Sequence, residues 1–552
     1  MDATAALATP IPDARGINLH RADPDAAALH ALHLPPDLAA HLAPHFDRLG
    51  ALAGGHLDEL AATADRNPPT LSVRRRTGQD ASDIAKHPAY VEMERLAYSE
   101  FGLAALSHRG GVLGWPAPMP PAAKYALTYL FVQAEFGLCC PVSMTDSLTR
   151  TLRKFGAPEL VERYLDRLTS LDFDTLAQGA MFMTEQGAGS DVAATATRAE
   201  PSNEATWRLW GDKWFCSNAD ADLAMVLARS EDAPGLSGIS LFLLPKLRAD
   251  GTANAYRILR LKDKLGTRSM ASGEIRLEGA EAYLVGERGR GFKQMADMIN
   301  NSRLSNGMRA AGLMRRATTE ALHIARHRHA FGRALIDLPL MRRQLAKLLV
   351  PTEQARAMMF ATADALARAD QGDATAAKLA RILTPLIKFR ACRDARRVTG
   401  DAMEVRGGCG YIEEWPDARL LRDAHLGSIW EGTSNIVALD VMRAITREGA
   451  LPVLVNHLRG RTDDPAFRHH LDRAAAFAEQ VAGQGDETLA RQAASGLYHA
   501  TTAIALAWEA AKANLPHRLA LARLVLAHRL ARRDPLAAPD DAALIDAVLA
   551  AA

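Results

Sequence analysis

The sequence of 552 residues contains few cysteines, and their spacing fits neither a disulfide framework nor a metal site. No two of them form a CxxC pair, and the adjacent His469 and His470 have no further ligand at a suitable spacing. We therefore predict no metal and a reducing, cytoplasmic environment. The cysteines are Cys139, Cys140, Cys216, Cys392 and Cys409.

Long apolar runs are also absent. No stretch reaches the roughly 18 uninterrupted apolar residues of a membrane span. The first residues, which read MDATAALATPIPDARG, lack the basic start and apolar centre of a secretory signal. We expect a protein that has no membrane segment and is not exported.

Net charge and aromatic content are low. Lys and Arg number 66 against 64 Asp and Glu, so the total charge neither requires nor excludes a polyanionic partner. Residues 301–450 carry 24 basic and 16 acidic residues, whereas residues 451–552 carry 11 of each. Aromatic residues make up 6% and alanine is abundant, which favours helices.

Hydrophobic spacing divides the chain into helical, strand-rich and again helical regions. Strand-like stretches include 206–210 and 213–217, long helices are expected over 292–330, 338–370 and 374–406, and an amphipathic run is expected from Thr502 to Arg533. Because strands and helices do not alternate, the glycines of Gly286-Glu-Arg-Gly289-Arg-Gly291 do not indicate a dinucleotide-binding Rossmann unit. The predicted class is α+β, mainly α. The expected regions are an arm with small helices (1–80), a helical domain (81–176), a β domain (177–290), a helical bundle (291–450) and a further helical domain (451–552).

Six short segments carry residues that suit a bound cofactor and proton transfer. In the first, two glycines and small hydroxylated residues allow a planar or phosphorylated ligand to approach the backbone. In the second, strand alternation places Phe215 and Ser217 on one face. Taken alone, the first is compatible with an ordinary turn and Phe215 with core packing. The segments are 183–191, 211–218, 262–269, 327–332, 403–411 and 429–435.

Together and in this order, the six segments resemble the acyl-CoA dehydrogenase family across residues 85–450. The resemblance implies the acyl-CoA dehydrogenase fold, with an N-terminal helical domain, a central β-barrel-like domain and a C-terminal four-helix bundle. It also implies an FAD-dependent oxidoreductase that acts on an acyl-CoA thioester and assembles as a homotetramer.

The resemblance further implies which residues bind FAD. Thr184 and Ser217 would bond the flavin ring, and Arg328 would reach the pyrophosphate in a neighbouring subunit, where a guanidinium suits phosphate oxygens. Gln186 and Glu404 depart from the family's usual proline and glutamine. The expected FAD-binding residues are Met183, Thr184, Gly189, Ser190, Phe215, Ser217, Arg328, Phe331, Gly407, Gly408, Trp430, Gly432, Thr433 and Asn435.

The resemblance assigns the catalytic base to Glu431 and places Arg303 near the substrate. The chemistry explains why a carboxylate belongs there. A proton on the carbon next to a thioester is only weakly acidic, so its removal needs a base whose pKa is raised by an apolar, dehydrated pocket.

Further stretches resemble the AidB-like, alkylation-response branch of the family. They are 66–69, 87–90, 138–145 and 261–269, and the branch also has an extra C-terminal helical domain, here 451–552. This resemblance implies binding of double-stranded DNA through the extra domain, protection against alkylation damage, and weak activity on a short branched acyl-CoA such as isovaleryl-CoA.

Basic residues near the C-terminus would form one DNA-binding face if they lie on one side of their helices. The equal numbers of basic and acidic residues in this region argue against a phosphate-binding module, and a solvated stripe explains the cluster equally well. Three hypotheses stay open: a DNA-associated flavoprotein, which we favour; an ordinary acyl-CoA dehydrogenase with an assembly-only domain; and a non-catalytic flavin scaffold. The candidate DNA contacts are Lys512, Arg518, Arg523, Arg529, Arg532 and Arg533, with the pairs Arg315-Arg316, Arg342-Arg343 and Arg396-Arg397 as additional surface charge.

Overall fold

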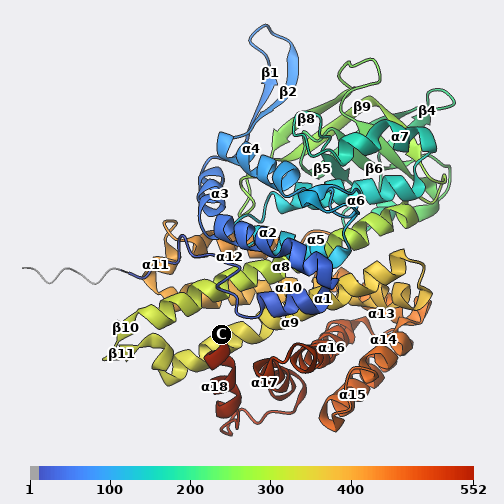
Figure 1. Ribbon diagram of the computed structural model, residues 1–552. Coiled ribbons are helices and arrows are strands. Elements are labelled where there is room, and N and C mark those ends of the chain that lie inside the picture. Colours follow the sequence, from blue (N-terminus) through green and yellow to red (C-terminus); the bar gives the residue numbers. More distant parts are fainter. Residues whose placement is uncertain (1–10) are drawn as a thin grey trace, which may run out of the picture.

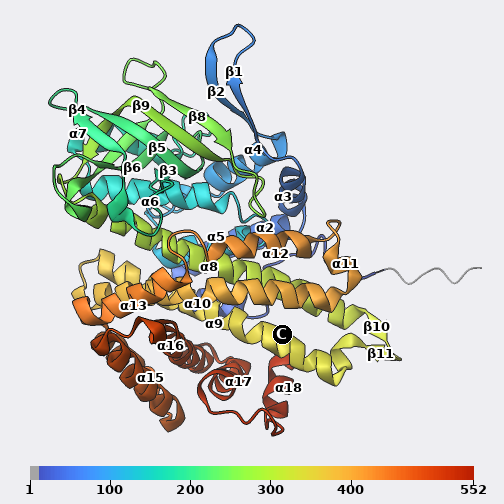
Figure 2. The same ribbon diagram turned by 180° about the vertical axis from the view of Figure 1, so that it is seen from behind.

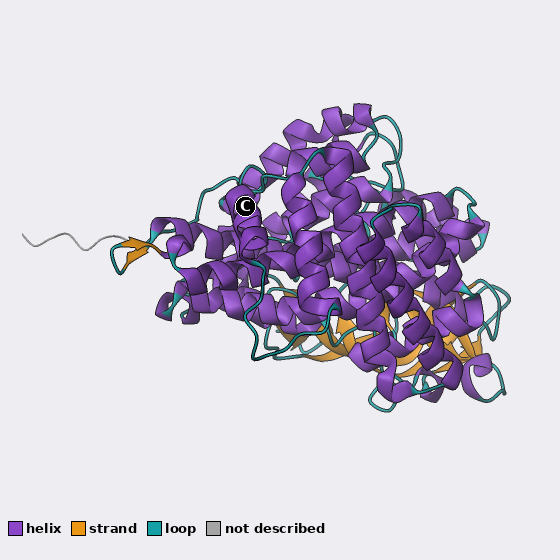
Figure 3. Cartoon of the chain, turned by 90° about the horizontal axis from the view of Figure 1, so that it is seen from below, coloured by secondary structure: helices purple, strands orange, loops and turns teal. Residues whose placement is uncertain are grey.

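The structure, a computed structural model, describes residues 11–552 in three layers (Figure 1). The β domain lies at the top, long helices cross the middle, and the last helices lie below them. Seen from below, the strands of the β domain occupy one side of a mainly helical molecule (Figure 3). Residues 1–10, which belong to the predicted N-terminal arm, lie outside the described part of the chain.

The N-terminal region is helical with one small hairpin. Four of its helices begin at a proline, whose fixed φ and missing N–H suit the first helical position. The predicted boundary at residue 80 falls within the hairpin, which projects from the body (Figures 1 and 2). The elements are α1 (Ala26–His33), α2 (Pro36–Gly54), α3 (His56–Arg66), β1 (Thr70–Arg74), β2 (Asp80–Ala85), α4 (Pro88–Glu94), a π-helical turn (Arg95–Glu100), α5 (Pro121–Phe131), α6 (Cys139–Phe155) and α7 (Pro158–Leu168).

The β domain is a seven-stranded, barrel-like sheet in the order β3-β6-β4-β5-β9-β7. A further pairing of β6 with β7 closes the sheet, and β8 pairs with β9. The stretches 206–210 and 213–217, predicted as separate, form the single strand β5, whose register shifts at two points. The strands are β3 (Gly179–Phe182), β4 (Arg198–Pro201), β5 (Trp207–Ser217), β6 (Leu223–Arg229), β7 (Ile239–Pro245), β8 (Tyr256–Leu261) and β9 (Ser272–Val285).

Strand β6 is apolar and buried on both faces because it separates two cores. Met225 and Leu227 belong to the large core shared with the helices, whereas Ala224 and Val226 belong to the smaller core of the barrel. Side chains alternate along a strand, so one apolar run serves both cores. The barrel is thereby fixed against the helical layers.

The central bundle follows the helical spacing of the sequence. The predicted stretches 292–330, 338–370 and 374–406 match three long helices to within a few residues. A short antiparallel hairpin, formed by two-residue strands, joins the first long helix to the second. The elements are α8 (Gly291–His327), β10 (His329–Ala330), β11 (Arg333–Ala334), α9 (Pro339–Asp370), α10 (Ala374–Arg406), α11 (Gly408–Tyr411), α12 (Pro416–Gly427) and α13 (Ser434–Glu448).

The extra C-terminal region packs on the bundle through α16, which lies against α9, α10 and α13 (Figures 1 and 2). A continuous amphipathic run from Thr502 to Arg533 was expected, but Asn514 is left-handed with φ 55° and Pro516 starts a new helix. The run is therefore broken. The elements are α14 (Ala450–Arg459), α15 (Pro465–Gln484), α16 (Ala490–Ala513), α17 (Pro516–Val525), a π-helical turn (Leu526–Leu530) and α18 (Ala542–Ala551).

A buried ion cluster joins the N-terminal region, the bundle and the C-terminal region. The Arg518 side chain is 0% exposed. Its Nη1 donates to Asp25 Oδ2 at 2.8 Å and to Glu353 Oε2 at 2.7 Å, and its guanidinium also pairs with Glu509. Because Asp25 precedes α1 and Glu353 lies on α9, the cluster fixes the C-terminal region to both the N-terminal region and the central bundle.

This burial corrects the predicted basic face. Arg518 is wrong as a DNA contact, since no solvent reaches it. Arg523 pairs with Asp464 at 2.7 Å, and burial lowers the pKa of the Arg529 guanidinium. The additional pair Arg315-Arg316 is also wrong as surface charge, because both side chains are buried. The exposed members of the predicted face are Lys512, Arg532 and Arg533.

Two structural findings concern membranes and metals. None of the helices in the described residues is both long and apolar enough to cross a bilayer. Within residues 11–552, no three His, Cys, Asp or Glu side chains are grouped so as to hold a metal ion.

Candidate active site

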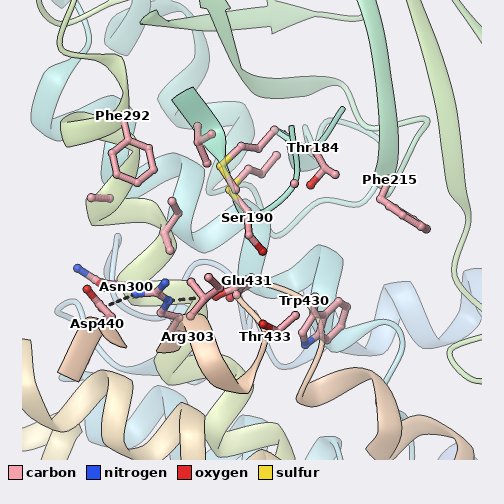
Figure 4. A pocket seen from close by; sticks show the side chains of 18 of the residues that line it. Thr184, Ser190, Phe215, Phe292, Asn300, Arg303, Trp430, Glu431, Thr433 and Asp440 are labelled. Carbon is pink, nitrogen blue, oxygen red and sulfur yellow. Dashed lines mark hydrogen bonds and ion pairs between the residues drawn. The ribbon is translucent and has the colours of Figure 1, made fainter. Parts of the chain in front are cut away.

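A cavity of about 1380 Å³ lies between the β domain, α8 and the loop that joins α12 to α13 (Figure 4). Residues from four of the six predicted segments line it, together with the start of α8. The predicted site residues in its wall are Met183, Thr184, Gly189, Ser190, Phe215, Ser217, Arg303, Trp430, Glu431, Gly432 and Thr433.

The loop 428–433, which we call the base loop, holds Glu431 in an unusual conformation. Glu431 has φ 55° and Gly432 has φ 98°, so two consecutive residues are left-handed. For a residue with a side chain, this conformation costs on the order of 1–3 kcal/mol and persists only where the surroundings enforce it. The loop brings the Glu431 side chain to the cavity wall.

The two carboxylate oxygens of Glu431 have different surroundings. Oε1 accepts a hydrogen bond from the Ser302 hydroxyl on α8. Oε2 is buried and has no hydrogen-bond partner among the described residues. Ser302 therefore orients the carboxylate and leaves one oxygen available for a proton.

Arg303 binds the backbone of the base loop rather than the Glu431 carboxylate. Its Nε donates to the Glu431 carbonyl oxygen at 3.1 Å, and its Nη1 donates to Asp440 Oδ2 at 2.7 Å (Figure 4). Burial alone would raise the pKa of Asp440, but Arg303 and Arg381 lower it below its usual range. Arg303 lines the cavity, and it also supports the base loop.

Arg309 is a buried residue that the sequence did not reveal. Its side chain is 0% exposed, and its guanidinium carbon lies 4.6 Å from the centre of the Trp430 ring and 5.6 Å from that of Phe136. None of its three side-chain nitrogens has a hydrogen-bond partner in the described part of the chain. Its contacts with the two aromatic rings are cation–π contacts, which hold Trp430 beside Glu431.

The glycine-rich segment 183–191 is fixed to the barrel by a buried ion pair. Lys213 Nζ donates to Glu185 Oε1 at 2.6 Å, and the Trp214 amide donates to the Thr184 carbonyl at 2.8 Å. These contacts place Thr184 and Ser190 in the cavity wall (Figure 4). This ion pair was not predicted from the sequence, although Glu185 lies in the segment 183–191 and Lys213 in the segment 211–218.

The wall formed by this segment and β5 fits a large planar cofactor. A Cβ built on Gly187 or Gly189 would meet no atom within 4 Å, so the backbone there is open to a ligand. Phe215 is 56% exposed, which rules out the alternative of core packing. Ser217 lines the same cavity. Open backbone, hydroxyl groups and an uncovered ring are the features that FAD needs.

The segment 262–269 closes another side of the cavity. Thr267 is left-handed with φ 52°, and its amide donates to the buried Asp423 Oδ1 of α12 at 2.6 Å. Burial raises the pKa of Asp423 to about 7. Burial also lowers the pKa of Lys264 to about 8, and its ammonium group donates to the Met270 carbonyl at 2.7 Å.

Five predicted FAD-binding residues do not line this cavity. Arg328 Nη1 donates to the Arg406 carbonyl at 3.2 Å, which brings the end of α8 next to Gly407. The C-terminal ends of α8 and α10 therefore lie together, at the end of the bundle that carries β10 and β11 (Figure 1). Asn435 is exposed and accepts from Arg491 Nη1 at 3.4 Å. The five are Arg328, Phe331, Gly407, Gly408 and Asn435.

The helical, barrel and bundle order, with a carboxylate in a cavity between barrel and bundle, defines the class of flavin-dependent acyl-CoA dehydrogenases. Three family profiles match the chain. The acyl-CoA dehydrogenase C-terminal domain matches residues 289–446, the acyl-CoA dehydrogenase middle domain matches 180–280, and the N-terminal domain of the adaptive response protein AidB matches 11–175. The chain belongs to the acyl-CoA dehydrogenase family, and FAD is its cofactor.

The relatives indicate the AidB-like branch. The chain is 33% identical over 451 residues to the putative acyl-CoA dehydrogenase AidB of Escherichia coli K12, with 80% of each chain covered. It is 32% identical to the solved structure of Bd2924 in its apo form, with a TM-score of 0.84 and coverage of 91% of this chain and 100% of that one.

A further solved structure is that of Caenorhabditis elegans ACDH-11 in complex with C11-CoA. The two chains are 27% identical, the TM-score is 0.86, and the alignment covers 97% of this chain and 95% of that one. The similarity therefore includes the extra C-terminal region.

Proposed function

We propose that this acyl-CoA dehydrogenase uses Glu431 as the base that removes the α-proton of an acyl-CoA thioester. The observation that supports the proposal is the Glu431 carboxylate in the cavity wall, with Oε1 bonded to Ser302 and Oε2 without a partner among the described residues. A base must lie within hydrogen-bond reach of the proton it takes, and Oε2 is the carboxylate oxygen that has no hydrogen-bond partner among the described residues.

The residues around Glu431 have separate roles in this proposal. Ser302 orients the carboxylate, and Arg303 holds the backbone of the base loop. Apolar side chains such as Ile429 and Met183 form part of the cavity wall. Thr184 and Ser217 would hold the ring of FAD, which supplies the hydride acceptor.

The proposed substrate is a short branched acyl-CoA such as isovaleryl-CoA, used at a low rate. The C. elegans ACDH-11 complex adds an eleven-carbon thioester as a second candidate, because its fold matches over 97% of this chain. The volume of about 1380 Å³ must accommodate both a flavin ring and an acyl chain.

We expect one of these thioesters to bleach the visible absorbance of the bound flavin. The measurement is an anaerobic titration of the FAD-bound protein with isovaleryl-, butyryl- and undecanoyl-CoA. Free coenzyme A is the control, since it has no α-proton beside a thioester and must leave the spectrum oxidised. If none of the thioesters reduces the flavin, the non-catalytic scaffold remains the better hypothesis.

A homotetramer is part of the same proposal. Arg328, Gly407 and Gly408 lie together but outside the cavity, so they would contact FAD only across a subunit boundary. Phe331 is 89% exposed beside them, and an apolar ring so exposed suits a protein contact.

A cytoplasmic location fits the cysteines, because all five are free thiols in the described residues.

Binding of double-stranded DNA with protection against alkylation is the second candidate. It is supported by the match of residues 11–175 to the adaptive response protein AidB and by the exposed side chains Lys512, Arg532 and Arg533. The alternative, an extra region that only assembles the protein, is supported by the ion pairs of Arg518 and Arg523 with carboxylates of the fold.

For DNA binding through these three side chains, we expect weak affinity with a modest salt dependence. Each phosphate contact contributes a slope of about −0.9 in a plot of log affinity against log salt, so three contacts give roughly −3 per subunit. The measurement is duplex binding across a salt series. Replacing all three with Ala should remove this slope, whereas Arg468→Ala, also exposed but in α15, should not. No binding at low salt would favour the assembly-only region.

A further inference from the structure

We propose that Lys388, near the middle of α10, is a positioning residue for the base loop. Its ammonium group holds the Gly432 carbonyl and thereby keeps Glu431 in the left-handed conformation that faces the cavity. The inference rests on the proposed function in one respect only, namely that Glu431 is the base.

Lys388 and Arg303 bind two consecutive carbonyls of the base loop. Lys388 Nζ donates to the Gly432 oxygen, and Arg303 Nε donates to the Glu431 oxygen at 3.1 Å. The donors come from α10 and α8, which pack against each other. Two cations on neighbouring helices thus fix both peptide planes that follow Glu431.

The loop needs such support because its conformation is disfavoured. Glu431 has φ 55° although it carries a side chain, and its carboxylate must still point at the cavity. A hydrogen bond from a charged donor is roughly twice as strong as a neutral one. Without the bond from Lys388, Gly432 is free to turn, and the Glu431 side chain turns with the backbone that follows it.

Lys388 has no competing partner in the part of the chain that is described. It is 1% exposed, and no carboxylate there lies within ion-pair distance of its ammonium group. The titratable and charged groups that act on it are Cys392 on its own helix, Glu431 on the base loop and Arg303 on α8. The Gly432 carbonyl is therefore the contact that determines where the ammonium group lies.

Burial lowers the pKa of Lys388 to about 8, and this makes the contact sensitive to pH. Above pH 8 the neutral amine is a weaker donor, so the base loop relaxes and flavin reduction slows. Burial raises the pKa of Cys392 to about 11, outside this range. Lys264, in the cavity wall, also has a pKa lowered to about 8, so the experiment must separate the two lysines.

The first measurement is the rate of flavin reduction by a saturating acyl-CoA in the FAD-bound protein, from about pH 6 to about pH 10. We expect the wild-type rate to fall about tenfold, with a midpoint near pH 8. Lys388→Arg stays charged and should remove this fall. Lys388→Met should be at least about tenfold slower than the wild type below pH 8 and should show no alkaline fall.

The control is Lys378→Met, which removes an exposed lysine from the same helix and should match the wild type. If Lys388→Arg keeps the alkaline fall, the titrating group is Lys264 or another residue, and the proposal is overturned. A Lys388→Met rate equal to that of the wild type below pH 8, where Lys388 is charged, would also overturn it.

A second measurement does not depend on turnover. Amide hydrogen exchange of residues 428–436 in the FAD-bound protein, corrected for the intrinsic pH dependence, should be about tenfold faster in Lys388→Met and restored in Lys388→Arg. Exchange in α10 should be unchanged, which shows that the variant is folded. If no thioester reduces the wild type, the role of Glu431 fails, but this comparison still decides whether Lys388 holds the loop. Unchanged loop exchange in Lys388→Met would refute that role.

Discussion

Glu431→Gln is expected to slow thioester-driven flavin reduction by at least about 10³-fold, because an amide of the same shape cannot accept the α-proton. FAD binding should persist. Ser302 still finds an oxygen acceptor at this position, and the base loop is held through its backbone by Arg303 and Lys388. The measurement is the single-turnover reduction rate, together with the flavin content of the purified variant.

A matched control for this substitution is Glu414→Gln. Glu414 is exposed in the segment before α12 and undergoes the same change in charge. Its reduction rate should equal that of the wild type. If reduction persists in Glu431→Gln at a rate close to that of the control, another group removes the α-proton and the assignment of the base is wrong.

Arg518→Met is expected to lower the free energy of unfolding by about 3–5 kcal/mol. This is the largest loss that we expect from a single substitution where the C-terminal region packs on the rest of the fold. The variant leaves the carboxylates of Glu509, Asp25 and Glu353 buried without their common cation. The measurement is denaturant unfolding followed by probes in the C-terminal region. Lys512→Met is the control, because the exposed Lys512 should change stability by no more than about 0.5 kcal/mol.

The free energy of unfolding lost in Arg518→Met should depend on pH because of the Glu509 carboxyl group. Burial alone would raise the pKa of Glu509, but Arg518 and His33 lower it to about 2 from an ordinary value of 4.5. A lowered folded pKa contributes stability that is fully present above pH 4.5 and is lost as the pH falls through about 2. The gap between wild type and Arg518→Met should therefore narrow over this window. A gap that is constant with pH would mean that the Arg518–Glu509 pair contributes little.

The ion cluster also changes the interpretation of the C-terminal region. A cluster of basic residues near the end of a chain suggests a DNA-binding face, yet Arg518 lies in the interior and Arg523 is paired with Asp464. The exposed residues Lys512, Arg532 and Arg533 remain for any contact with phosphates. Two of the six basic residues, Arg518 and Arg523, therefore pair with carboxylates of the fold.

Much of the cavity wall was predictable because it depends on short segments. Glycines next to small hydroxylated residues in 183–191, alternation in 213–217 and the sequence of 429–435 each have a local physical meaning. Residues from all three segments meet in the cavity. Arg328 and Gly407 were implied by the family resemblance, and the cavity of a single chain does not include them.

The sequence by itself determined the order of helical, barrel and bundle regions, the bounds of the long helices and the position of Glu431. These depend on hydrophobic period and on motifs within a few residues. Only the tertiary structure decided that Lys388, Arg309 and Arg518 are interior cations, and that β5 is one strand. The physical reason is that helical spacing shows which side chains share a face, whereas packing decides whether that face meets water, a carboxylate, an aromatic ring or a loop carbonyl.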